Sequence, residues 1–555
     1  MPETPSPTSG RESRWIHAVG PPLLLAVAYA IHSFTIGYVS DDGFIGFQYV
    51  KHFLQGDGFV YNNDERVEGY TNFLWLALLA GVMRLLPSLD LLFLSQVLGV
   101  FFGAIAVWAV CSFSRNIASE RGGASLLAGA FLATHTSFAA WATSGLETTM
   151  FALTLLAAAQ AYVVYLRTGK RFWLPPVLFA FVTMVRPDGM LFAAVTGLHF
   201  VVWESRRRGA PAIARITCWA LIFAAIFGSY FAARFSFYGE FLPNTFYAKV
   251  VGATSYEIGW RYVGRYIAMH GLLVFGPALW LLISRGSEPE QRVWQDYFAG
   301  LVLSYTAYVI YVGGDGLAFF RFFAHIAPLL YLLVQAGYIE AYRSLRSRFT
   351  AIPESAWTSG ALAVVAISLC YGARQGALPL LSPESERWFE PHSQLHFPGT
   401  GVEHDYTWFD NYFVARQAIA ADWLEQNAPP DSLVAATPAG SISYHMSHRV
   451  LDMLGLNDHH IARTDPGTVG YPRAGHMKGD GAYVLARKPD YILMGNVAVL
   501  PVPLDEAQMA KKTVRKSEHE IWQTPDFHRD YQLVSVRLAD SGPFQYFSFY
   551  KRRAP

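Results

Sequence analysis

The sequence predicts a polytopic α-helical membrane protein that carries a soluble α/β domain in its C-terminal part. Apolar residues make up 52% of the 555 residues and charged residues only 15%, which is too apolar for a soluble protein of this length. Apolar stretches of membrane-spanning length recur up to about residue 378, and the remaining chain is more polar. A formal net charge of +1 offers no positive field for nucleic acid, so we expect no nucleic-acid partner.

The N-terminal segment, residues 1–14, is polar and contains Arg11 and Arg14. The apolar segment that follows it is too long and too weakly flanked for a cleaved signal peptide. We therefore expect this apolar segment to be retained as the first membrane span.

Eleven apolar stretches are long enough to cross about 30 Å of hydrocarbon with some slack for polar ends. They lie near residues 15–36, 91–112, 123–141, 147–166, 172–186, 189–204, 213–236, 266–284, 295–312, 322–341 and 357–374. The stretch 73–86 is short and contains Arg84, so it suits an interfacial or re-entrant helix better than a span. We expect a transmembrane catalytic domain over residues 15–378 whose first outer loop covers residues 37–90.

Short basic clusters indicate the orientation of these spans. If residues 73–86 do not cross, every cluster lies on the side of the N-terminal arginines, at 115–121, 167–171, 206–208, 285–292 and 343–348. Basic loops mark the cytoplasmic side. We therefore expect a cytoplasmic N-terminus and a multi-pass protein of the bacterial inner (plasma) membrane, with its active site facing the periplasm or the cell exterior.

The opposite, outer loops carry the polar motifs. Asp41 and Asp42 follow the first span, and VEGYTNFLW (67–75) contains Glu68, Tyr70 and Asn72. The later outer loops are SGLET (144–148) with Glu147, RPDG (186–189) with Arg186 and Asp188, LPNTFYAK (242–249) with Asn244 and Lys249, and GGDG (313–316) with Asp315, followed by Arg321.

The acid pair is the candidate catalytic group. An ionised pair at a membrane surface costs solvation energy unless it binds or deprotonates a group. One acid can act as general base on an acceptor hydroxyl while the other orients the first, and the sequence does not say which. The alternative is that Asp41 and Asp42 cap a helix over residues 43–54, where the helix dipole favours acids. The other outer-loop motifs favour the catalytic role.

Arg186, Lys249 and Arg321 are candidate ligands of a phosphate, because cations at helix ends form charge-assisted hydrogen bonds with it. RPDG can instead form a local ion pair in a tight turn, and the other two cations can extend to lipid headgroups. Glu68 and Glu147 can bind sugar hydroxyls or a cation, and Glu147 can equally cap the fourth span. The sequence indicates no cofactor with certainty and leaves a divalent cation open.

Residues 379–555 predict a soluble α/β domain on the outer side. A helix is expected over residues 412–427, strands over 433–437 and 491–494, and a linker over 380–391. Two polar clusters there contain Asp452, Asn457, Asp458 and His459, and His476 and Lys478. We interpret both clusters as sugar-binding or loop-ordering groups rather than a zinc site. His459 and the adjacent His460 are poor joint zinc ligands, because neighbouring side chains on a helix point about 100° apart.

Taken in order, the motifs DDGFIGFQYVKHFLQGDGFVYNNDERVEGYTNFLW, SGLET, RPDG, LPNTFYAK, GGD with a downstream Arg, and VLDMLGLND resemble a bacterial GT-C arabinofuranosyltransferase family. The resemblance runs from about residue 38 to residue 495. It implies a multi-span GT-C enzyme that takes a sugar, D-arabinofuranose, from a polyprenyl-phosphate donor on the outer face. The acceptor is then a cell-envelope glycan or glycoprotein, and the acid pair of the first outer loop lies in the active site. The family more often has Ala where Gly43 stands.

Two other functions are consistent with these residues. One is a GT-C transferase that uses another polyprenyl-linked sugar for protein or lipopolysaccharide glycosylation, and the other is a lipid-linked sugar flippase. A transporter concentrates its polar residues near the bilayer midplane and often has repeated halves, whereas the polar motifs here gather at one face. The resemblance and the placement of the motifs favour an inverting transferase.

Overall fold

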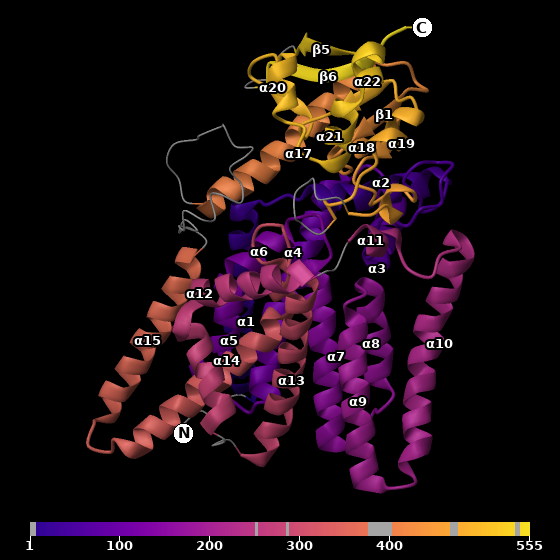
Figure 1. Cartoon of the computed structure of the whole chain (residues 1–555). Coiled ribbons are helices and arrows are strands. Elements are labelled where there is room, and N and C mark those ends of the chain that lie inside the picture. The colour runs from indigo at the N-terminus through magenta and orange to yellow at the C-terminus, as the bar shows by residue number, and fades with distance from the viewer. Residues whose placement is uncertain are drawn as a thin grey trace.

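The structure is a computed structural model that describes residues 7–249, 253–284, 288–375, 402–466, 475–538 and 544–554. Its N-terminal part is a bundle of long helices, and its C-terminal part is a small α/β domain placed over one end of the bundle (Figure 1). The predicted linker 380–391 and the predicted domain boundary at residues 378–379 lie outside the described residues.

The helices of the bundle run back and forth between its two ends (Figure 1). They are α1 (Pro7–Ile36), α4 (Leu91–Asn116), η1 (Gly122–Leu126), α5 (Leu127–Thr134), α6 (Thr136–Ala142), α7 (Thr148–Thr168), α8 (Leu174–Val185), α9 (Gly189–Arg208), α10 (Ala212–Tyr238), α12 (Ala253–Ser284), α13 (Pro289–Val312), α14 (Arg321–Arg348) and α15 (Glu354–Gln375). Three further helices lie at the end that faces the α/β domain: α2 (Asp41–Gln55), α3 (Phe73–Leu85) and α11 (Asn244–Ala248).

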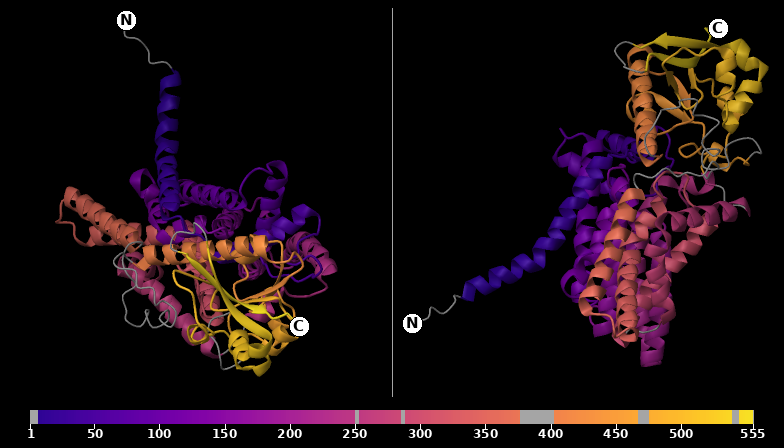
Figure 2. Two further views of the ribbon diagram at one scale, coloured as in Figure 1. Left: turned by 90° about the horizontal axis from the view of Figure 1, so that it is seen from above. Right: turned by 90° about the vertical axis from the view of Figure 1, so that its left-hand side faces the viewer.

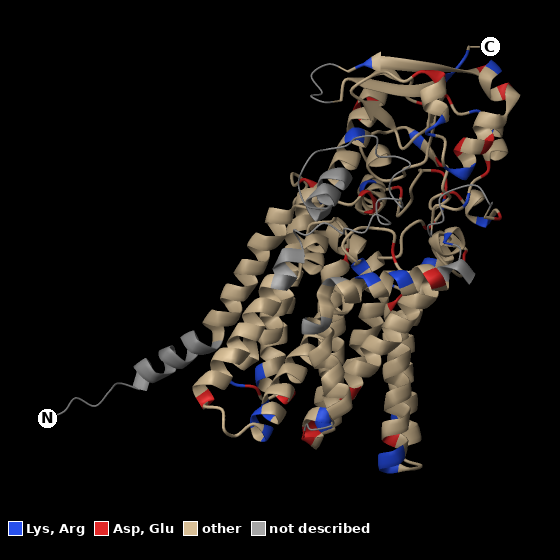
Figure 3. Ribbon diagram, turned by 60° about the vertical axis from the view of Figure 1, so that its left-hand side comes forward, with Lys and Arg blue, Asp and Glu red and all other residues tan. Residues whose placement is uncertain are grey.

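The composition of these helices confirms the predicted class of a polytopic helical membrane protein. Among the described residues, α1, α4, α7, α10 and α14 contain windows long and apolar enough to cross a membrane. Only 6% of the α10 window is buried inside the protein, so its outward face is suited to lipid. Figure 3 shows Lys, Arg, Asp and Glu near the two ends of the bundle and few along its middle.

The predicted number of eleven spans is not established by these criteria. Each predicted span coincides with helical structure, but the stretch 123–141 is divided into η1, α5 and α6, and α8 is only 12 residues long. Within α12 the backbone of Gly271 leaves the helical region, with φ of 65°, and this breaks the helix. Helix α3 is 13 residues long and lies at the bundle end, and the interfacial character predicted for residues 73–86 stays a prediction.

The C-terminal domain is a six-stranded mixed sheet with helices on both faces. Its strands are β1 (Leu433–Ala436), β2 (Arg449–Asp452), β3 (Tyr491–Leu493), β4 (Ala498–Leu500), β5 (Tyr531–Arg537) and β6 (Tyr546–Arg552), and its helical segments are α17 (Val402–Asn427), α18 (Ser441–Tyr444), η2 (Ile461–Arg463), α19 (Gly481–Ala486), α20 (Glu506–Ala510), α21 (Lys516–Gln523) and α22 (Pro525–Asp530). The order is β2-β1-β3-β6-β4, with β5 beside β6. The predicted helix over 412–427 and the two predicted strands are confirmed.

Alternation along the central strands explains the two faces of this sheet. Val434 belongs to the same hydrophobic core as Leu424 of α17, whereas its neighbour Ala435 belongs to a second core with Ile492 and Ile521. The parallel strands β1, β2 and β3 all end at the edge that faces the bundle, since the loop after β1 continues into α18, which contacts α2. Ligands of open α/β sheets bind at this carboxyl edge.

Side chains from the segment 37–90 hold the domain in place. Lys51 donates to the carbonyl oxygens of Tyr444 and Met446 at 2.9 and 3.0 Å, and the Tyr61 hydroxyl donates to that of Ala439 at 2.8 Å. Seen from above, the domain covers only part of the bundle end, and the N-terminal part of α1 projects away from the other helices (Figure 2).

Candidate functional site at the end of the bundle that faces the C-terminal domain

The acid pair lies at the start of α2, in the first turn after Ser40. The predicted alternative, a helix that begins with acidic residues, is therefore present, and the helix dipole favours both carboxylates. The two side chains have different surroundings. Asp41 is enclosed, and its Oδ1 accepts a hydrogen bond of 2.7 Å from the backbone N–H of Ser441 in α18. Asp42 keeps 44% of its side chain exposed and lies 3.9 Å from Arg321.

Burial raises the pKa of Asp41 to about 7, against the hydrogen bonds that its carboxylate accepts from Ser441 and Gln417. The charge of Asp42 raises this pKa further. Asp41 therefore joins three segments that are far apart in the sequence: α2, α17 and α18.

Arg321 opens α14 beside the acid pair. Its Nε donates to Asp315 at 2.6 Å, and its guanidinium lies over the ring of Trp141 at 5.3 Å. The two residues before it, Phe319 and Phe320, have φ of 59° and 43°, values that bulky L-residues rarely adopt. Such strain persists only where surrounding structure fixes it, so the loop that presents Arg321 is held in one conformation.

Lys249 follows the short helix α11 and has an exposed side chain. The surrounding protein and the positive charge of Arg321 lower its pKa, whereas the charge of Asp42 raises it. An amine whose charge is disfavoured both by the surrounding protein and by a neighbouring cation is stabilised when an anion binds between the two cations. Asp42, Lys249 and Arg321 thus form one group, here called the acid–cation site.

Arg186 is buried next to this site and is already paired. It donates to Glu147 at 2.5 Å and to Asp188 at 2.9 Å, which confirms the local ion pair predicted for RPDG. Asn72 donates to the other oxygen of Glu147 at 2.7 Å, and Tyr308 donates to Asp188 at 3.0 Å. This network joins the ends of α7, α8 and α13 that lie beside the acid–cation site.

Glu68 and Tyr70 lie in a second buried network. Glu68 forms an ion pair of 2.5 Å with Arg234 of α10, and burial raises the pKa of Glu68 while Arg234 lowers it. The hydroxyls of Tyr70 and Tyr238 are 3.1 Å apart. Sequence reasoning missed Arg234, although an arginine inside an apolar helix is a signal for a buried partner.

The predicted polar residues of the C-terminal domain mainly order its loops. Asp452 accepts from the backbone N–H groups of Leu454, Gly455 and Asn457, and burial raises its pKa to about 6. Asp458 accepts from Ile461, and Lys478 donates to the Ala462 carbonyl at 2.6 Å.

Two predicted polar residues, Asn244 of α11 and His459 of the C-terminal domain, connect the domain to the bundle. The side chain of Asn244 donates to the carbonyl oxygens of Gly455, Leu456 and Asp458, and His459 lies 2.9 Å from Glu240. His476 is half-buried in the loop after residue 474. A sugar-binding role for these side chains stays a prediction.

A divalent cation has no evident site in the part of the chain that the structure describes. There, no group of three or more His, Cys, Asp or Glu side chains is arranged to hold a metal ion.

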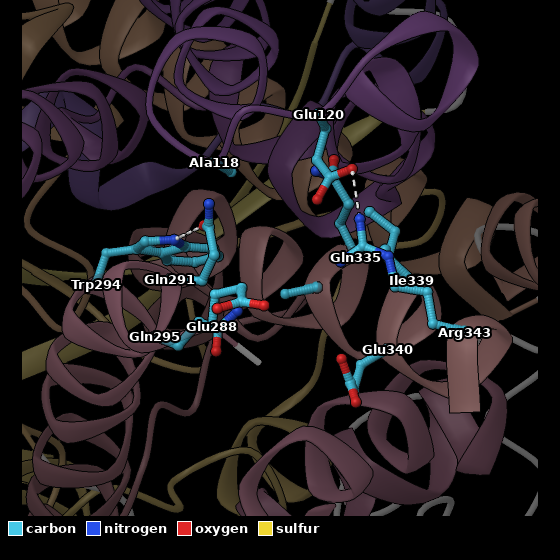
Figure 4. A pocket seen from close by; sticks show the side chains of 11 residues that line it. Ala118, Glu120, Glu288, Gln291, Trp294, Gln295, Gln335, Ile339, Glu340 and Arg343 are labelled. Atoms are coloured by element: carbon cyan, nitrogen blue, oxygen red, sulfur yellow. Dashed lines mark hydrogen bonds and ion pairs between the residues drawn. The ribbon is translucent and has the colours of Figure 1, made fainter. Parts of the chain in front are cut away.

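A separate small pocket lies at the opposite end of the bundle, between α4, α13 and α14 (Figure 4). It holds about 30 Å³, enough for about two water molecules. Its polar lining includes Glu120, Glu288, Gln335, Glu340 and Arg343, with Glu120 and Arg343 3.7 Å apart. It shares no residue with the acid–cation site.

Comparisons with known proteins give few matches in sequence. A family model described as a domain of unknown function, DUF8728, matches residues 410–550, within the C-terminal α/β domain. No curated protein matches the chain.

Among solved structures, the chain is similar to ArnT from Cupriavidus metallidurans, both bound to undecaprenyl phosphate and in the apo state. These two likenesses have TM-scores of 0.47 with 11% and 12% identity, and they cover 77% and 80% of this chain and 84% and 86% of the other. A cryo-EM structure of the arabinofuranosyltransferase AftD from Mycobacteria has a TM-score of 0.47 and 14% identity, and it covers 96% of this chain and 40% of that one. Because these TM-scores are below 0.5, the function proposed below rests on the residues of this chain.

Proposed function

We propose that the chain is an inverting membrane glycosyltransferase that transfers a sugar from a polyprenyl-phosphate donor to a cell-envelope glycan or glycoprotein. The observation that carries the proposal is the acid–cation site, an exposed carboxylate next to two cations at the end of the bundle where the outer loops meet. A base next to an anion site suits a reaction that removes a proton and releases a phosphate. The resemblance of the ordered motifs to GT-C arabinofuranosyltransferases narrows the sugar to D-arabinofuranose.

Asp42 is the base in this proposal. It accepts the proton of an acceptor hydroxyl as that oxygen attacks the anomeric carbon of the donor sugar. The bond between the anomeric carbon and the phosphate oxygen breaks on the opposite side, so the configuration inverts. Lys249 and Arg321 stabilise the negative charge that develops on the leaving polyprenyl phosphate. One base suffices, because the phosphate leaves without needing a proton from a second carboxyl group.

Asp41 and Arg186 have supporting roles. Asp41 receives the hydrogen bond from Ser441 and so positions the C-terminal domain above the acid–cation site. The guanidinium of Arg186 is held by Glu147 and Asp188, so its charge favours an anion nearby without a direct contact. This division assigns different roles to two neighbouring acids that the sequence alone could not separate.

The test is transfer by the purified full-length chain. With polyprenyl-phosphate β-D-arabinofuranose and an arabinofuranose-containing acceptor, we expect release of polyprenyl phosphate and a product one pentose heavier. Transfer from a nucleotide sugar alone would contradict the lipid-linked donor. If a polyprenyl-linked hexose is used and arabinofuranose is not, the glycosyltransferase assignment stands and the sugar assignment falls. Movement of the intact donor across vesicles without transfer would identify a flippase instead.

A further inference from the structure

Arg416 of α17 is a buried arginine that has no matching negative charge among the described residues. Its side chain is 8% exposed, and its Nε has no hydrogen-bond partner among the described residues. The rings of Tyr412 and Phe413 each lie 5.5 Å from its guanidinium. No carboxylate of the described residues forms an ion pair with it. Cation–π contacts stabilise such a group only in part, and an unpaired buried charge is costly to a folded protein.

A second cation lies close to Arg416. Lys512, in the connection between α20 and α21, has its pKa lowered by burial and by the charge of Arg416. It likewise forms no ion pair with a described carboxylate. Two partly desolvated cations that repel each other create a local positive potential, and binding an anion between them would lower their electrostatic energy.

The backbone near Lys512 supports this interpretation. The side chain of Lys512 packs on Gly495, in the loop that follows β3. Gly495, Asn496 and Val497 have φ of 64°, 59° and 59°, and a β-branched residue in this region is strained. Glu518 fixes the loop by accepting from Gly495 N–H at 3.0 Å and from Thr437, after β1, at 2.6 Å. The two cations therefore lie beside the carboxyl edge of the parallel strands, where α/β domains bind ligands.

This place is also close to the acid pair. Gln417, the residue after Arg416, accepts a hydrogen bond from Ile442 N–H at 3.2 Å and contacts the carboxyl group of Asp41. Consecutive Cα atoms are about 3.8 Å apart, so the backbone of Arg416 lies next to a residue that contacts the start of α2. An extended acceptor molecule that presents one hydroxyl group to Asp42 can therefore reach Arg416 with another group of the same molecule.

We propose that Arg416 and Lys512 form an anion-binding subsite of the C-terminal domain, which receives a phosphate or carboxylate group carried by the acceptor. The identification of the ligand as an acceptor rests on the proposed function. It adds a substrate class: acceptors that bear a negative charge at a fixed distance from the hydroxyl that is glycosylated. Binding would neutralise both cations at once and offset the cost of keeping them desolvated.

A lysine footprint on the purified full-length protein tests the subsite directly. The acetylation rate of each lysine is measured by mass spectrometry, with inorganic phosphate or acetate added at constant ionic strength. We expect phosphate at about four times its Kd to slow acetylation of Lys512 about fivefold in the wild type and not in Arg416→Gln. Lys511, its exposed neighbour, is the control and should not respond. Equal rates at Lys512 with and without both anions would overturn the proposal.

Thermal unfolding separates a ligand site from a structural arginine. Arg416→Met keeps much of the side-chain volume but removes the unmatched charge, so we expect a higher unfolding midpoint than in the wild type without added anion. A lower midpoint would give Arg416 a structural role and overturn the proposal. A second result would also overturn the proposal: faster acetylation of Lys512 after Glu384, Glu386 and Glu390 are replaced by Gln. That result would mean that a carboxylate of the chain itself binds the two cations in the wild type.

Acceptor kinetics identify the charged group and keep the two proposals apart. With a phosphate-bearing or a carboxylate-bearing acceptor, Arg416→Gln should raise KM about tenfold for whichever acceptor uses the subsite, as expected for loss of about 1.4 kcal/mol of binding. KM for a neutral acceptor should be unchanged, and an equal rise for all three would contradict the subsite. If Lys512 is protected by anions but no sugar is transferred, the subsite stands and the transferase assignment fails.

Discussion

Asp41 and Asp42 are neighbours in the sequence, yet their carboxylates have opposite surroundings: one is enclosed against α18 and the other faces Arg321. Asp42→Asn keeps the shape of the side chain and removes the base, so we expect kcat to fall by about 10²- to 10⁴-fold with little change in thermal stability. The measurement is the initial rate of polyprenyl phosphate release. Full activity in Asp42→Asn would remove this residue from the mechanism.

Asp41 should instead control how stability depends on pH. Its pKa rises from 3.8 to about 7 on folding, so the folded protein binds a proton that the unfolded chain has lost between these values. This stabilisation is complete below pH 4 and is lost as pH rises through 7. The unfolding midpoint of the wild type should fall across this window, and Asp41→Asn, which cannot ionise, should fall less. Asp42→Asn is the control, because it retains Asp41.

Lys249 in the acid–cation site and Arg186 beside it should respond differently to substitution. Lys249→Ala removes an exposed ligand of the phosphate, so we expect the donor KM to rise about tenfold while the acceptor KM is unchanged. Arg186→Gln leaves Glu147 and Asp188 without their partner and should destabilise the fold by about 3–5 kcal/mol. Donor titrations and denaturation curves measure the two effects. A Lys249→Ala enzyme with unchanged donor dependence would return this lysine to a contact with lipid headgroups.

At the level of elements, the sequence indicated local features well and distant contacts poorly. The turn between α8 and α9 and its Arg186–Asp188 pair could be predicted, because both charges and the proline lie within four residues. The hydrogen bond from Ser441 to Asp41 joins residues 400 apart, and no local pattern reports it. Hydropathy also could not show that the predicted span 123–141 is divided at His135, since apolar composition does not record a change in backbone direction.

The contact between α2 and α18 depends on a small residue. A Cβ added to Gly440 would lie 2.1 Å from the Asp41 carbonyl oxygen, a distance that forces the two elements apart. We expect Gly440→Ala to lower the transfer rate and the unfolding midpoint together. Gly228→Ala, in α10, is the matched control, because its added Cβ meets nothing within 4 Å. Equal behaviour of the two variants would mean that the close packing of α2 on α18 is not required.

For the molecule as a whole, the α/β domain and the acid–cation site lie at one end of the bundle, and the Arg206–Arg208 cluster closes α9 at the other (Figures 1 and 3). This separation is what an enzyme with a lipid-linked donor needs. A nucleotide sugar made in the cytoplasm cannot carry its charged phosphates through hydrocarbon unaided, so a site on the outer face must be supplied by a donor that is already attached to lipid.

The orientation itself is testable with two exposed positions at opposite ends of the bundle, Asp57 and Arg207. In a background without Cys111, Cys218 and Cys370, a cysteine is introduced at each position in turn. The basic clusters predict that Asp57→Cys reacts with a membrane-impermeant thiol reagent in intact cells and that Arg207→Cys reacts only after the membrane is permeabilised. The reverse pattern would place the acid–cation site in the cytoplasm, where nucleotide sugars are available. The argument for a lipid-linked donor would then lose its physical basis even if transfer activity were found.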